Sequence, residues 1–453
     1  MAHTSITENP IIFTMETLFD KNHLYKSYFS LSLPVMLGMI VSLVYNLTDT
    51  FFIAQTGNTN LIAGVSLCTP LFTTLMAAGN IFGQGGSSLI SRMLGEGDEK
   101  GTRRISSFCF YISLVVGAVL AILLTLSSTP VLRLLGADSE TMQYAKEYFT
   151  VLSVSSPIVV VNFIHTNLLR CEGKAKESMT ATILGAVTNI ILDPIMISTL
   201  GLGAFGAALA TVIGYLVTVI FCLIVLLKKS RYLSVRPGDC RARGNEVGEI
   251  LGVGISAALS NIAQSFTTIL LNRFLLPYGN ESIAAFGIVS KINMIVLLIL
   301  TGFAFGGVPL FGYLYGADDR EALGKIVRFC LLFLSLLALL LTAVILPAAP
   351  LLMKVFVSDT TLIETGAEML RWQTVTSICV GLVLLYTVLF QAMGKVIPSL
   401  LLSISRQGIV FLIAIVICAH LFAYRGILMS QAVADVISAI LAVAMYLHYS
   451  RKN

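Results

Sequence analysis

The amino-acid sequence predicts an all-α membrane protein, with twelve transmembrane helices in two six-helix lobes related by a pseudo-two-fold axis along the membrane normal. The first observation behind this prediction is composition, since 56% of the residues are hydrophobic, 12% are charged and the mean hydropathy is +0.89. Soluble proteins carry about 25% charged residues, which excludes a soluble globular class. The second observation is a series of apolar runs about 20 to 30 residues long, enough to cross a hydrocarbon core of about 30 Å as helices.

The third observation is an internal repeat, in which the second half of the chain matches the first half at a constant offset. Gly85 pairs with Gly306 and Gly95 pairs with Gly316, each 221 residues apart (306 − 85). Each half holds six spans, an even number, so both halves enter the bilayer from the same side and the repeats are parallel. Two like lobes with a cleft between them favour a transporter that works by alternating access, although a pore can also be built from repeats.

Hydropathy and helix-breaking residues divide the chain into its expected spans. The spans are 29–54, 61–89, 105–128, 141–169, 177–199, 203–227, 249–276, 282–312, 322–346, 362–392, 397–420 and 424–448. The longest polar connection contains Pro237 and Gly238 and is the expected boundary between lobes. The expected divisions are an N-terminal segment (1–28), an N-lobe (29–227, spans one to six), a linker (228–248), a C-lobe (249–448, spans seven to twelve) and a tail (449–453).

Lysine and arginine residues concentrate in alternate loops. One side holds the basic residues of the N-terminal segment, the linker, the tail and the loops around 92–104, 170–176 and 320–328, whereas the opposite loops hold little beyond Arg133, Lys354 and Arg425. By the positive-inside rule, both termini and the linker are expected to be cytoplasmic. The same bias accounts for the net charge of +5, so nucleic acid is not an expected partner.

The first candidate functional stretch is TNIILDPIMI, which begins at Thr188 and places polar residues inside an apolar run. A carboxylate at that depth costs roughly 2.5 to 3.5 kcal/mol on insertion scales, so Asp193 is expected to face the protein interior or an aqueous cavity. Asn189 lies four residues earlier and shares its helix face. Pro194 has no N–H, which leaves the carbonyl of Ile190 without its usual partner. Carboxylate, amide and carbonyl oxygens together suit a proton or a small hard cation, although Asn189 could merely bond a neighbouring helix.

A second acid and a hydroxyl are predicted at the same depth. Asp49 on the first span and Asp193 on the fifth each lie about 8 Å from the outer end of their helix, and Thr211 lies about 12 Å down the sixth. Such a group can carry a proton, or hold Na⁺ if its oxygens close around the ion. The offset places Leu270 and Ala414 opposite the two acids, so we expect ion coupling in the first lobe alone.

The second half offers a different polar set, namely Lys291, Arg406 and Asp435 on the eighth, eleventh and twelfth spans. Lys291 and Asp435 come out at similar depths, about 13 and 16 Å from the outer surface, so we expect a structural ion pair, with substrate binding as the other interpretation. Three methionines on the first two spans could line an adaptable apolar substrate cavity. These are Met36, Met39 and Met76.

Sequence motifs of enzymes give no support for catalysis. The chain has no Walker-type loop, GxSxG, HExxH or CxxC pattern, so neither ATP hydrolysis nor a metalloenzyme is indicated. We therefore expect no enzyme and no cofactor, with H⁺ or Na⁺ as the coupling ion.

Seven stretches together resemble the multidrug and toxic compound extrusion (MATE) family, and within it the bacterial branch of DinF- and MepA-type proteins. The resemblance covers nearly the full length of the chain. In the first half the stretches are the entry Pro34 with YNLTDTFFIAQTG from Tyr45, GQGGSSLISRMLGEGD from Gly83, LLRCEGKAK from Leu168, TNIILDPIMI, and GAFGAALATVIGY from Gly203. In the second half they are PLFGYLYGADDR from Pro309 and FQAMGKVIPS from Phe390.

The resemblance implies a multidrug efflux antiporter of a bacterial cytoplasmic membrane, which exports amphipathic, often cationic compounds in exchange for H⁺ or Na⁺. It implies an ion site built from an Asp on the first helix, an Asn and an Asp on the fifth and a Thr on the sixth. The matching residues here are Asp49, Asn189, Asp193 and Thr211. The expected partners are small-molecule drugs, organic cations and the lipid bilayer, and we expect a monomer.

Two other functions remain open from the sequence. The alternative within transport is a flippase for a lipid-linked precursor, which a strongly cationic cavity would favour because pyrophosphate must be neutralised. Lys291, Arg371 and Arg406 leave that alternative open. The alternative from another class is a receptor or channel that does not transport by alternating access.

Overall fold

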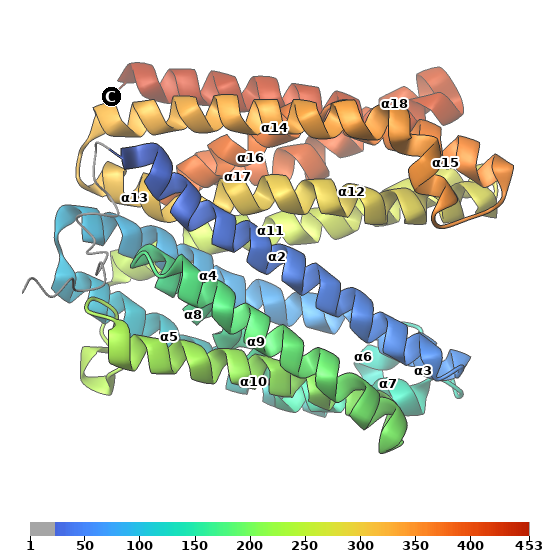
Figure 1. Ribbon diagram of the computed structural model, residues 1–453, viewed down its shortest axis with the longest axis horizontal. Helices are drawn as coiled ribbons and strands as arrows, with labels where there is room; N and C mark the ends of the chain where they lie inside the picture. Colours follow the sequence, from blue (N-terminus) through green and yellow to red (C-terminus); the bar gives the residue numbers. More distant parts are fainter. Residues whose placement is uncertain (1–22, 453) are drawn as a thin grey trace, which may run out of the picture.

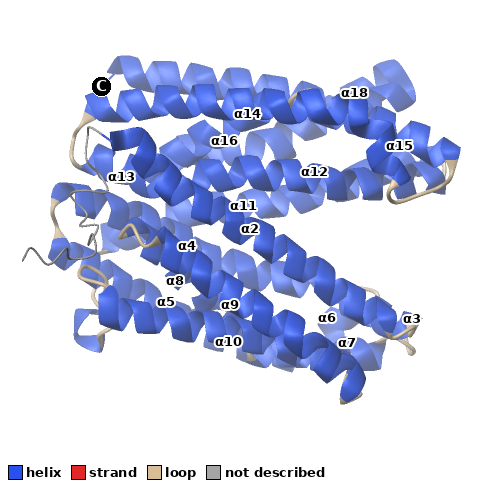
Figure 2. Ribbon diagram, viewed as in Figure 1, coloured by secondary structure: helices blue, strands red, loops and turns tan. Residues whose placement is uncertain are grey.

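The computed structural model describes residues 23–452, and within that range every regular element is a helix (Figure 2). Most of the predicted N-terminal segment, together with residue 453, lies outside the described residues. The all-helical prediction is confirmed over the described range.

The first half of the chain forms the N-lobe. Its helices are α2 (Leu24–Gln55), α3 (Thr59–Leu67), α4 (Thr69–Glu96), α5 (Glu99–Leu126), α6 (Ser128–Leu134), α7 (Met142–Val154), α8 (Ser156–Cys171), α9 (Ala175–Asp193), the π-helical turn η2 (Pro194–Thr199) and α10 (Gly203–Lys229). The linker follows and contains a single 3₁₀ turn, η3 (Pro237–Asp239).

The second half forms the C-lobe. Its helices are α11 (Gly244–Leu275), the 3₁₀ turn η4 (Leu276–Tyr278), α12 (Asn280–Gly306), α13 (Val308–Gly316), α14 (Arg320–Lys354), α15 (Thr360–Thr374), α16 (Ser377–Ala392), α17 (Val396–Ile404), the π-helical turn η5 (Ser405–Ile409) and α18 (Val410–Lys452).

Twelve membrane crossings can be traced through these elements. Nine helical segments of the described chain are long and apolar enough to cross a bilayer, and two bent pairs, α7 with α8 and α15 with α16, raise the number to eleven. The last segment runs for 55 residues from Val396 to Ser450, more than twice the length that one crossing needs. Its backbone leaves the helical conformation at Ala423 (φ 48°), which divides it into the eleventh and twelfth spans.

Prolines mark the points where spans divide into two helices. Pro70 lies in the first turn of α4, Pro157 in the first turn of α8 and Pro309 in the first turn of α13. A proline there loses nothing, because the first N–H groups of a helix have no intrahelical partner, yet its ring prevents the preceding helix from continuing straight. The axes of α7 and α8 differ by 56° as a result.

The internal repeat has a direct counterpart in local structure. Asp98 accepts a hydrogen bond from the Gly101 N–H at 2.8 Å and begins α5, and its repeat mate Asp319 accepts one from the Ala322 N–H at 3.1 Å and begins α14. Both are N-caps, which satisfy N–H groups that would otherwise lack a partner. The repeat is therefore a repeat of helix-capping chemistry as well as of sequence.

The two lobes touch closely at one end of the molecule. A Cβ atom added at Gly95 would collide with the Tyr313 carbonyl oxygen, and one added at Gly316 would collide with the Arg92 carbonyl oxygen. These contacts are related by the repeat, since Arg92 and Tyr313 also stand 221 residues apart (313 − 92). We call this the closed end. In Figure 1 it lies on the left, beside the C-terminus, and the lobes diverge toward the right.

Ion pairs reinforce the closed end. Arg92 of α4 pairs with Glu249 of α11, and Arg104 of α5 pairs with Glu246 of α11 at 2.5 Å. Each pair joins a residue of the first half to one of the second. The Arg92 and Glu246 side chains are largely buried, so these pairs are screened less than surface pairs.

The first helix of each half begins against the other half. Leu24, Tyr28 and Leu31 of α2 are buried in the core of the C-lobe, where the Tyr28 hydroxyl donates to the Phe303 carbonyl at 2.9 Å. Ile250 of α11 is buried in a core otherwise made by the N-lobe and by Leu233 of the linker. The first turns of α2 therefore pack with the C-lobe: Leu24 and Tyr28 belong to the predicted N-terminal segment and Leu31 to the predicted first span.

Candidate functional site

The candidate ion site lies where α9 and α10 approach most closely. A Cβ atom at Gly214 of α10 would stand 2.8 Å from the Gly185 carbonyl oxygen and 3.2 Å from the Asn189 Cβ atom. Only glycine leaves room for that approach, because a 2.8 Å separation is shorter than van der Waals contact. The close packing brings side chains from the two helices within bonding distance.

Three of the predicted residues form one hydrogen-bonded group there. The Asn189 amide donates to Asp193 Oδ1 at 3.1 Å and approaches Thr211 Oγ1 at 3.5 Å. The Thr211 hydroxyl in turn donates to the Ala207 carbonyl at 3.0 Å. All three side chains are buried, and Asp193 is 0% exposed.

Asp49 lies on α2, which packs along α9. Asp49 Oδ1, Asn189 Oδ1 and Asp193 Oδ2 are all buried oxygens that find no hydrogen-bond donor among the described residues. Buried polar atoms are normally paired, so these three oxygens, on two helices that pack together, fit a proton or a small cation as the missing partner.

Pro194 changes the helix at the site in a way that the sequence did not reveal. The helix does not end at the proline but passes from α9 into the π-helical turn η2, in which the Leu200 N–H donates to the Ile195 carbonyl. π-Helical turns are wider than α-helical turns and are frequent at functional sites. Asp193 is thus the last α-helical residue before the turn widens.

Three tyrosines on the helices of this region were missed by sequence reasoning. The hydroxyls of Tyr45 on α2 and Tyr215 on α10 are hydrogen-bonded to each other at 2.7 Å. Tyr148 of α7 is buried in the same apolar core as Tyr215. Tyr45 lies four residues before Asp49 on the same helix face, so this spacing could have identified Tyr45 from the sequence. No local sequence pattern points to Tyr148 or Tyr215.

A cavity of about 760 Å³ lies between the lobes beside this cluster. Its volume falls within the roughly 300–1,000 Å³ of drug-binding pockets. Asn189, Thr211 and the Tyr45–Tyr215 pair line the wall of the N-lobe, so the buried acids lie behind that wall. The cavity and the candidate ion site therefore share side chains.

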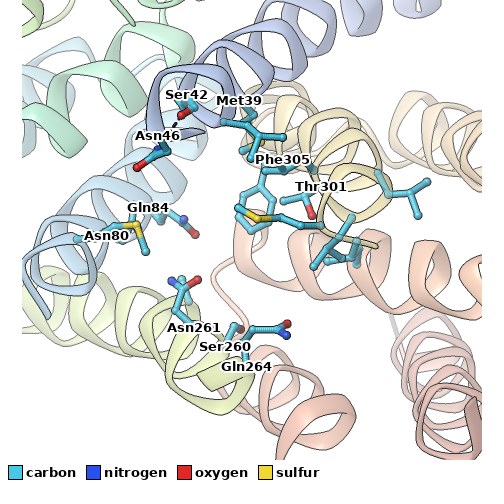
Figure 3. A pocket seen from close by; sticks show the side chains of 18 of the residues that line it. Met39, Ser42, Asn46, Asn80, Gln84, Ser260, Asn261, Gln264, Thr301 and Phe305 are labelled. Atoms are coloured by element: carbon cyan, nitrogen blue, oxygen red, sulfur yellow. Dashed lines mark hydrogen bonds between the residues drawn. The ribbon is translucent and has the colours of Figure 1, made fainter. Parts of the chain in front are cut away.

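Figure 3 shows the polar character of the cavity wall. Met39, Ser42 and Asn46 come from α2, Asn80 and Gln84 from α4, Ser260, Asn261 and Gln264 from α11, and Thr301 and Phe305 from α12. The amide side chains can both donate and accept hydrogen bonds, which suits varied polar ligands.

The predicted cavity residues divide into two groups. Met39, Met76 and Asp435 line the cavity, whereas Met36 and Lys291 do not. Met36 instead lies against Gly302 at the contact between α2 and α12. Lys291 is exposed on another face of α12 from Ser290 and Asn293, which line the cavity, because successive helical residues are turned by about 100°.

The predicted ion pair between Lys291 and Asp435 is wrong. Asp435 Oδ1 instead lies 3.8 Å from Arg406 Nη1 and accepts a hydrogen bond from the Gln431 amide at 3.0 Å, while Oδ2 accepts one from the Thr376 hydroxyl at 2.9 Å. Similar depth suggested Lys291, but depth does not report which way a helix face turns, and the two side chains point to different surroundings.

A family model described as MatE matches residues 34–195 and 256–418 of the chain. The two matched ranges fall one in each half, in agreement with the internal repeat.

Curated relatives are similar over almost the whole chain. The multidrug export protein MepA of Staphylococcus saprophyticus is 31% identical over 425 residues, which cover 94% of each chain. The protein of the same name from Staphylococcus haemolyticus is 30% identical and covers 96% of this chain and 95% of its own.

Solved structures share the fold. A structure described as MATE in the bent conformation has a TM-score of 0.89 and 28% identity, over 96% of this chain and 98% of that one. A structure described as the outward-facing conformation of a multidrug resistance MATE family transporter has a TM-score of 0.89 and 28% identity, over 95% of this chain and 97% of that one.

Proposed function

Because this chain belongs to the MATE family of transporters, we propose that it is a secondary active antiporter, which exports amphipathic organic compounds, cations included, in exchange for H⁺ or Na⁺. One observation carries the proposal. Buried oxygens of Asp49, Asn189 and Asp193 find no donor in the described part of the chain, and Asn189 also lines a drug-sized cavity between the two lobes. The relatives are named multidrug export proteins, which agrees with organic compounds as cargo.

Coupling would act through the wall that the ion site and the cavity share. A proton or Na⁺ bound by Asp49 and Asp193 would draw in Asn189 and Thr211, and thereby reshape the N-lobe wall of the cavity. Linkage requires the coupling to be reciprocal, so cargo and ion weaken each other's binding if they exchange. Bound cargo would in turn hinder ion uptake until it leaves.

We propose the membrane orientation from the basic loops. The closed end carries the loops that are rich in lysine and arginine, so the positive-inside rule makes it cytoplasmic, with both termini on that side of a bacterial cytoplasmic membrane. The cavity would then face the outside. We retain the expected division into segments 1–28, 29–227, 228–248, 249–448 and 449–453, and a monomer, as parts of this proposal.

The test is dye transport in proteoliposomes with pH and Na⁺ gradients imposed separately. Asp193→Asn keeps the shape of the side chain but removes its charge, so ion-driven ethidium efflux should fall to background in a protein that still folds. Asp318→Asn, at an acid with an 81% exposed side chain, is the control and should transport normally. Unchanged efflux in Asp193→Asn would exclude this ion site.

The flippase alternative has less support than the antiporter. Of the cations that left it open, only Arg406 lines the cavity, together with Arg170, while Lys291 and Arg371 do not. A pyrophosphate group needs several cations to neutralise it. Movement of a fluorescent lipid diphosphate between leaflets of proteoliposomes, without an ion gradient, would support the flippase.

A further inference from the structure

A second, much smaller cavity lies between the lobes, next to the large one. Its volume is about 20 Å³, which is room for one water molecule or one ion of similar size. The polar side chains that line it are Gln84, Ser87 and Ser88 of α4, Asn167 and Arg170 of α8, and Gln391 of α16. No carboxylate is found among the described residues that line it. Both lobes therefore contribute to one small polar site, which we call the bridging site.

Arg170 brings to the bridging site a positive charge that has no carboxylate partner. The arginines that join the lobes, Arg92 and Arg104, are each paired with a glutamate. Arg170 instead donates to Ser178 Oγ at 3.2 Å and approaches Asn167 Oδ1 at 3.5 Å, and neither neighbour is charged. A guanidinium group cannot lose its charge, and a charge held inside a protein normally has a counter-charge. Within the described part of the chain, Arg170 has none.

Gln391 supplies an unused hydrogen-bond donor from the opposite lobe. Its side chain is 3% exposed, and its amide nitrogen finds no acceptor among the described residues. Gln84 faces the same small cavity from α4, and Figure 3 shows it on the wall of the space between the lobes. The buried Gln84 amide oxygen finds no donor in the described chain, and a half-turn of the amide presents its N–H groups instead. A guanidinium and two amides therefore meet at one point.

The chemistry of the bridging site fits a small anion better than a cation or a water molecule. Arg170 repels cations. A single water could bond both amides but would leave the charge of Arg170 uncompensated. A halide ion compensates that charge and accepts hydrogen bonds from guanidinium and amide N–H groups. A carboxylate or a phosphate has more atoms than a space for one water molecule can hold.

The bridging site lies one helical turn from the ion pairs of the closed end. Arg92 follows Ser88 by four residues on α4, and its Nε donates to the Ser88 carbonyl at 3.3 Å. The Ser88 hydroxyl donates across the lobe boundary to the Gln391 carbonyl. An ion between Arg170 and Gln391 would therefore add to the contacts that join the lobes, and separation of the lobes would pull its ligands apart.

We propose that the bridging site binds a small monovalent anion, chloride in solutions of physiological composition, and that the bound anion stabilises the closed end. Arg170 supplies the charge, and the amides of Gln84 and Gln391 supply N–H donors from the two lobes. This anion is neither cargo nor coupling ion. Because it binds only while the lobes are together, its concentration shifts the equilibrium between the closed and open forms of this end.

Bromide locates the site directly, because it replaces chloride and scatters X-rays anomalously. Crystals of the full chain are grown in sodium bromide, and we expect an anomalous peak between Arg170 and Gln391. Bromide peaks on exposed residues alone would mean an adventitious ion only and would overturn the proposal. A water molecule in the small cavity, with no anomalous signal, would overturn it as well.

Hydrogen–deuterium exchange measures the effect of the anion on the closed end. The full chain in nanodiscs is titrated with sodium chloride, and sodium gluconate keeps the sodium concentration and ionic strength constant. Exchange in residues 88–95 of α4 should slow by roughly tenfold when chloride reaches about ten times its dissociation constant. Equal exchange in the two salts contradicts the proposal. Neither measurement uses a dye or an ion gradient, so the anion site is tested separately from the export function.

Four variants separate a bound anion from a general effect of salt. Arg170→Gln removes the charge and should abolish the response of exchange to chloride, whereas Arg170→Lys keeps the charge and should respond at higher chloride concentration. Gln391→Leu removes the donor from the C-lobe and should also shift the response to higher chloride. Arg133→Gln removes an exposed arginine of α6 that lines neither cavity, and it should respond as the parent protein does.

The variants also give the outcomes that would overturn the proposal. A full chloride response in Arg170→Gln would assign the effect to another part of the protein. If Arg170→Gln does not fold, Gln391→Leu decides, and a chloride response identical to that of the parent protein would exclude the bridging site.

Discussion

At the scale of single residues, the site is held together by hydrogen bonds among side chains that carry no catalytic chemistry. Asn189 bridges Asp193 and Thr211, so an amide organises the carboxylate and the hydroxyl. With its N–H donors committed in this way, the Asn189 oxygen has no donor among the described residues. The group therefore presents oxygens inward, which is what a cation requires.

Thr211 allows the hydroxyl to be tested separately from the shape of the side chain. Thr211→Val keeps the volume but removes the oxygen, and loss of a net hydrogen bond worth about 1 kcal/mol should weaken apparent affinity for the coupling ion by roughly fivefold. The measurement is the ion concentration that gives half-maximal dye efflux from proteoliposomes. Thr211→Ser keeps the hydroxyl and should behave as the parent protein does. Equal ion affinity in all three proteins would contradict a role for Thr211.

Sequence reasoning located some residues of the site and failed on others for identifiable reasons. Asp193 and Asn189 were found because an i, i+4 spacing fixes their common face and because acids are rare in apolar runs. The partner of Asp435 was mistaken because depth does not report which way a helix face turns, and no residue pattern before Arg406 announces the π-helical turn that contains it. Tyr148 comes from α7, beyond a 56° bend that sequence could not reveal.

At the scale of helices, irregular turns occur in both repeat-related helices at the level of their charged residue. In α9 the π-helical turn follows Asp193, and in the helix formed by α17 and α18 it contains Arg406. The two turns are not at matching positions of the repeat, since Asp193 corresponds to Ala414 (193 + 221). The lobes therefore share a helix framework but place their irregular turns independently.

The helices α9 and α10 also pack unusually close together, and a substitution at Gly214 can test how much the fold depends on that packing. Gly214→Val would drive a branched side chain into the Gly185 carbonyl and the Asn189 Cβ atom, and the overpacking should destabilise the protein by about 1–3 kcal/mol. We expect a lower melting temperature and loss of ion-driven efflux, both measured on purified protein. Gly287→Val on α12, where no atom lies within 4 Å of an added Cβ, is the matched control. Similar stability of the two variants would show that the helices can separate without cost.

At the scale of the whole molecule, the closed end is secured by backbone contacts between the lobes and by the Arg92–Glu249 and Arg104–Glu246 pairs. In the proposed antiporter, alternating access requires this end to open. The free energy of these contacts therefore sets how often the cavity faces the cytoplasm in the proposed orientation.

Glu249→Gln is expected to loosen the closed end. It leaves the largely buried Arg92 without its charged partner, which costs about 1–3 kcal/mol. Hydrogen–deuterium exchange should rise in residues 244–252 at the start of α11. Glu321→Gln removes the same charge from an exposed pair with Lys325 and should leave exchange there unchanged. Slower exchange in Glu249→Gln would mean that the pair strains the closed end.

The first turns of α2 and α11 each pack into the core of the other half of the chain, so neither half is complete without the other. Tyr28 is fully buried in the core of the C-lobe, and Ile250 is fully buried in a core made mainly by the N-lobe. If one half were expressed by itself, the apolar first turns of its first helix would have no core of the other half to pack against. We therefore expect the two halves to fold together, each giving the other an apolar surface on which its first helix starts.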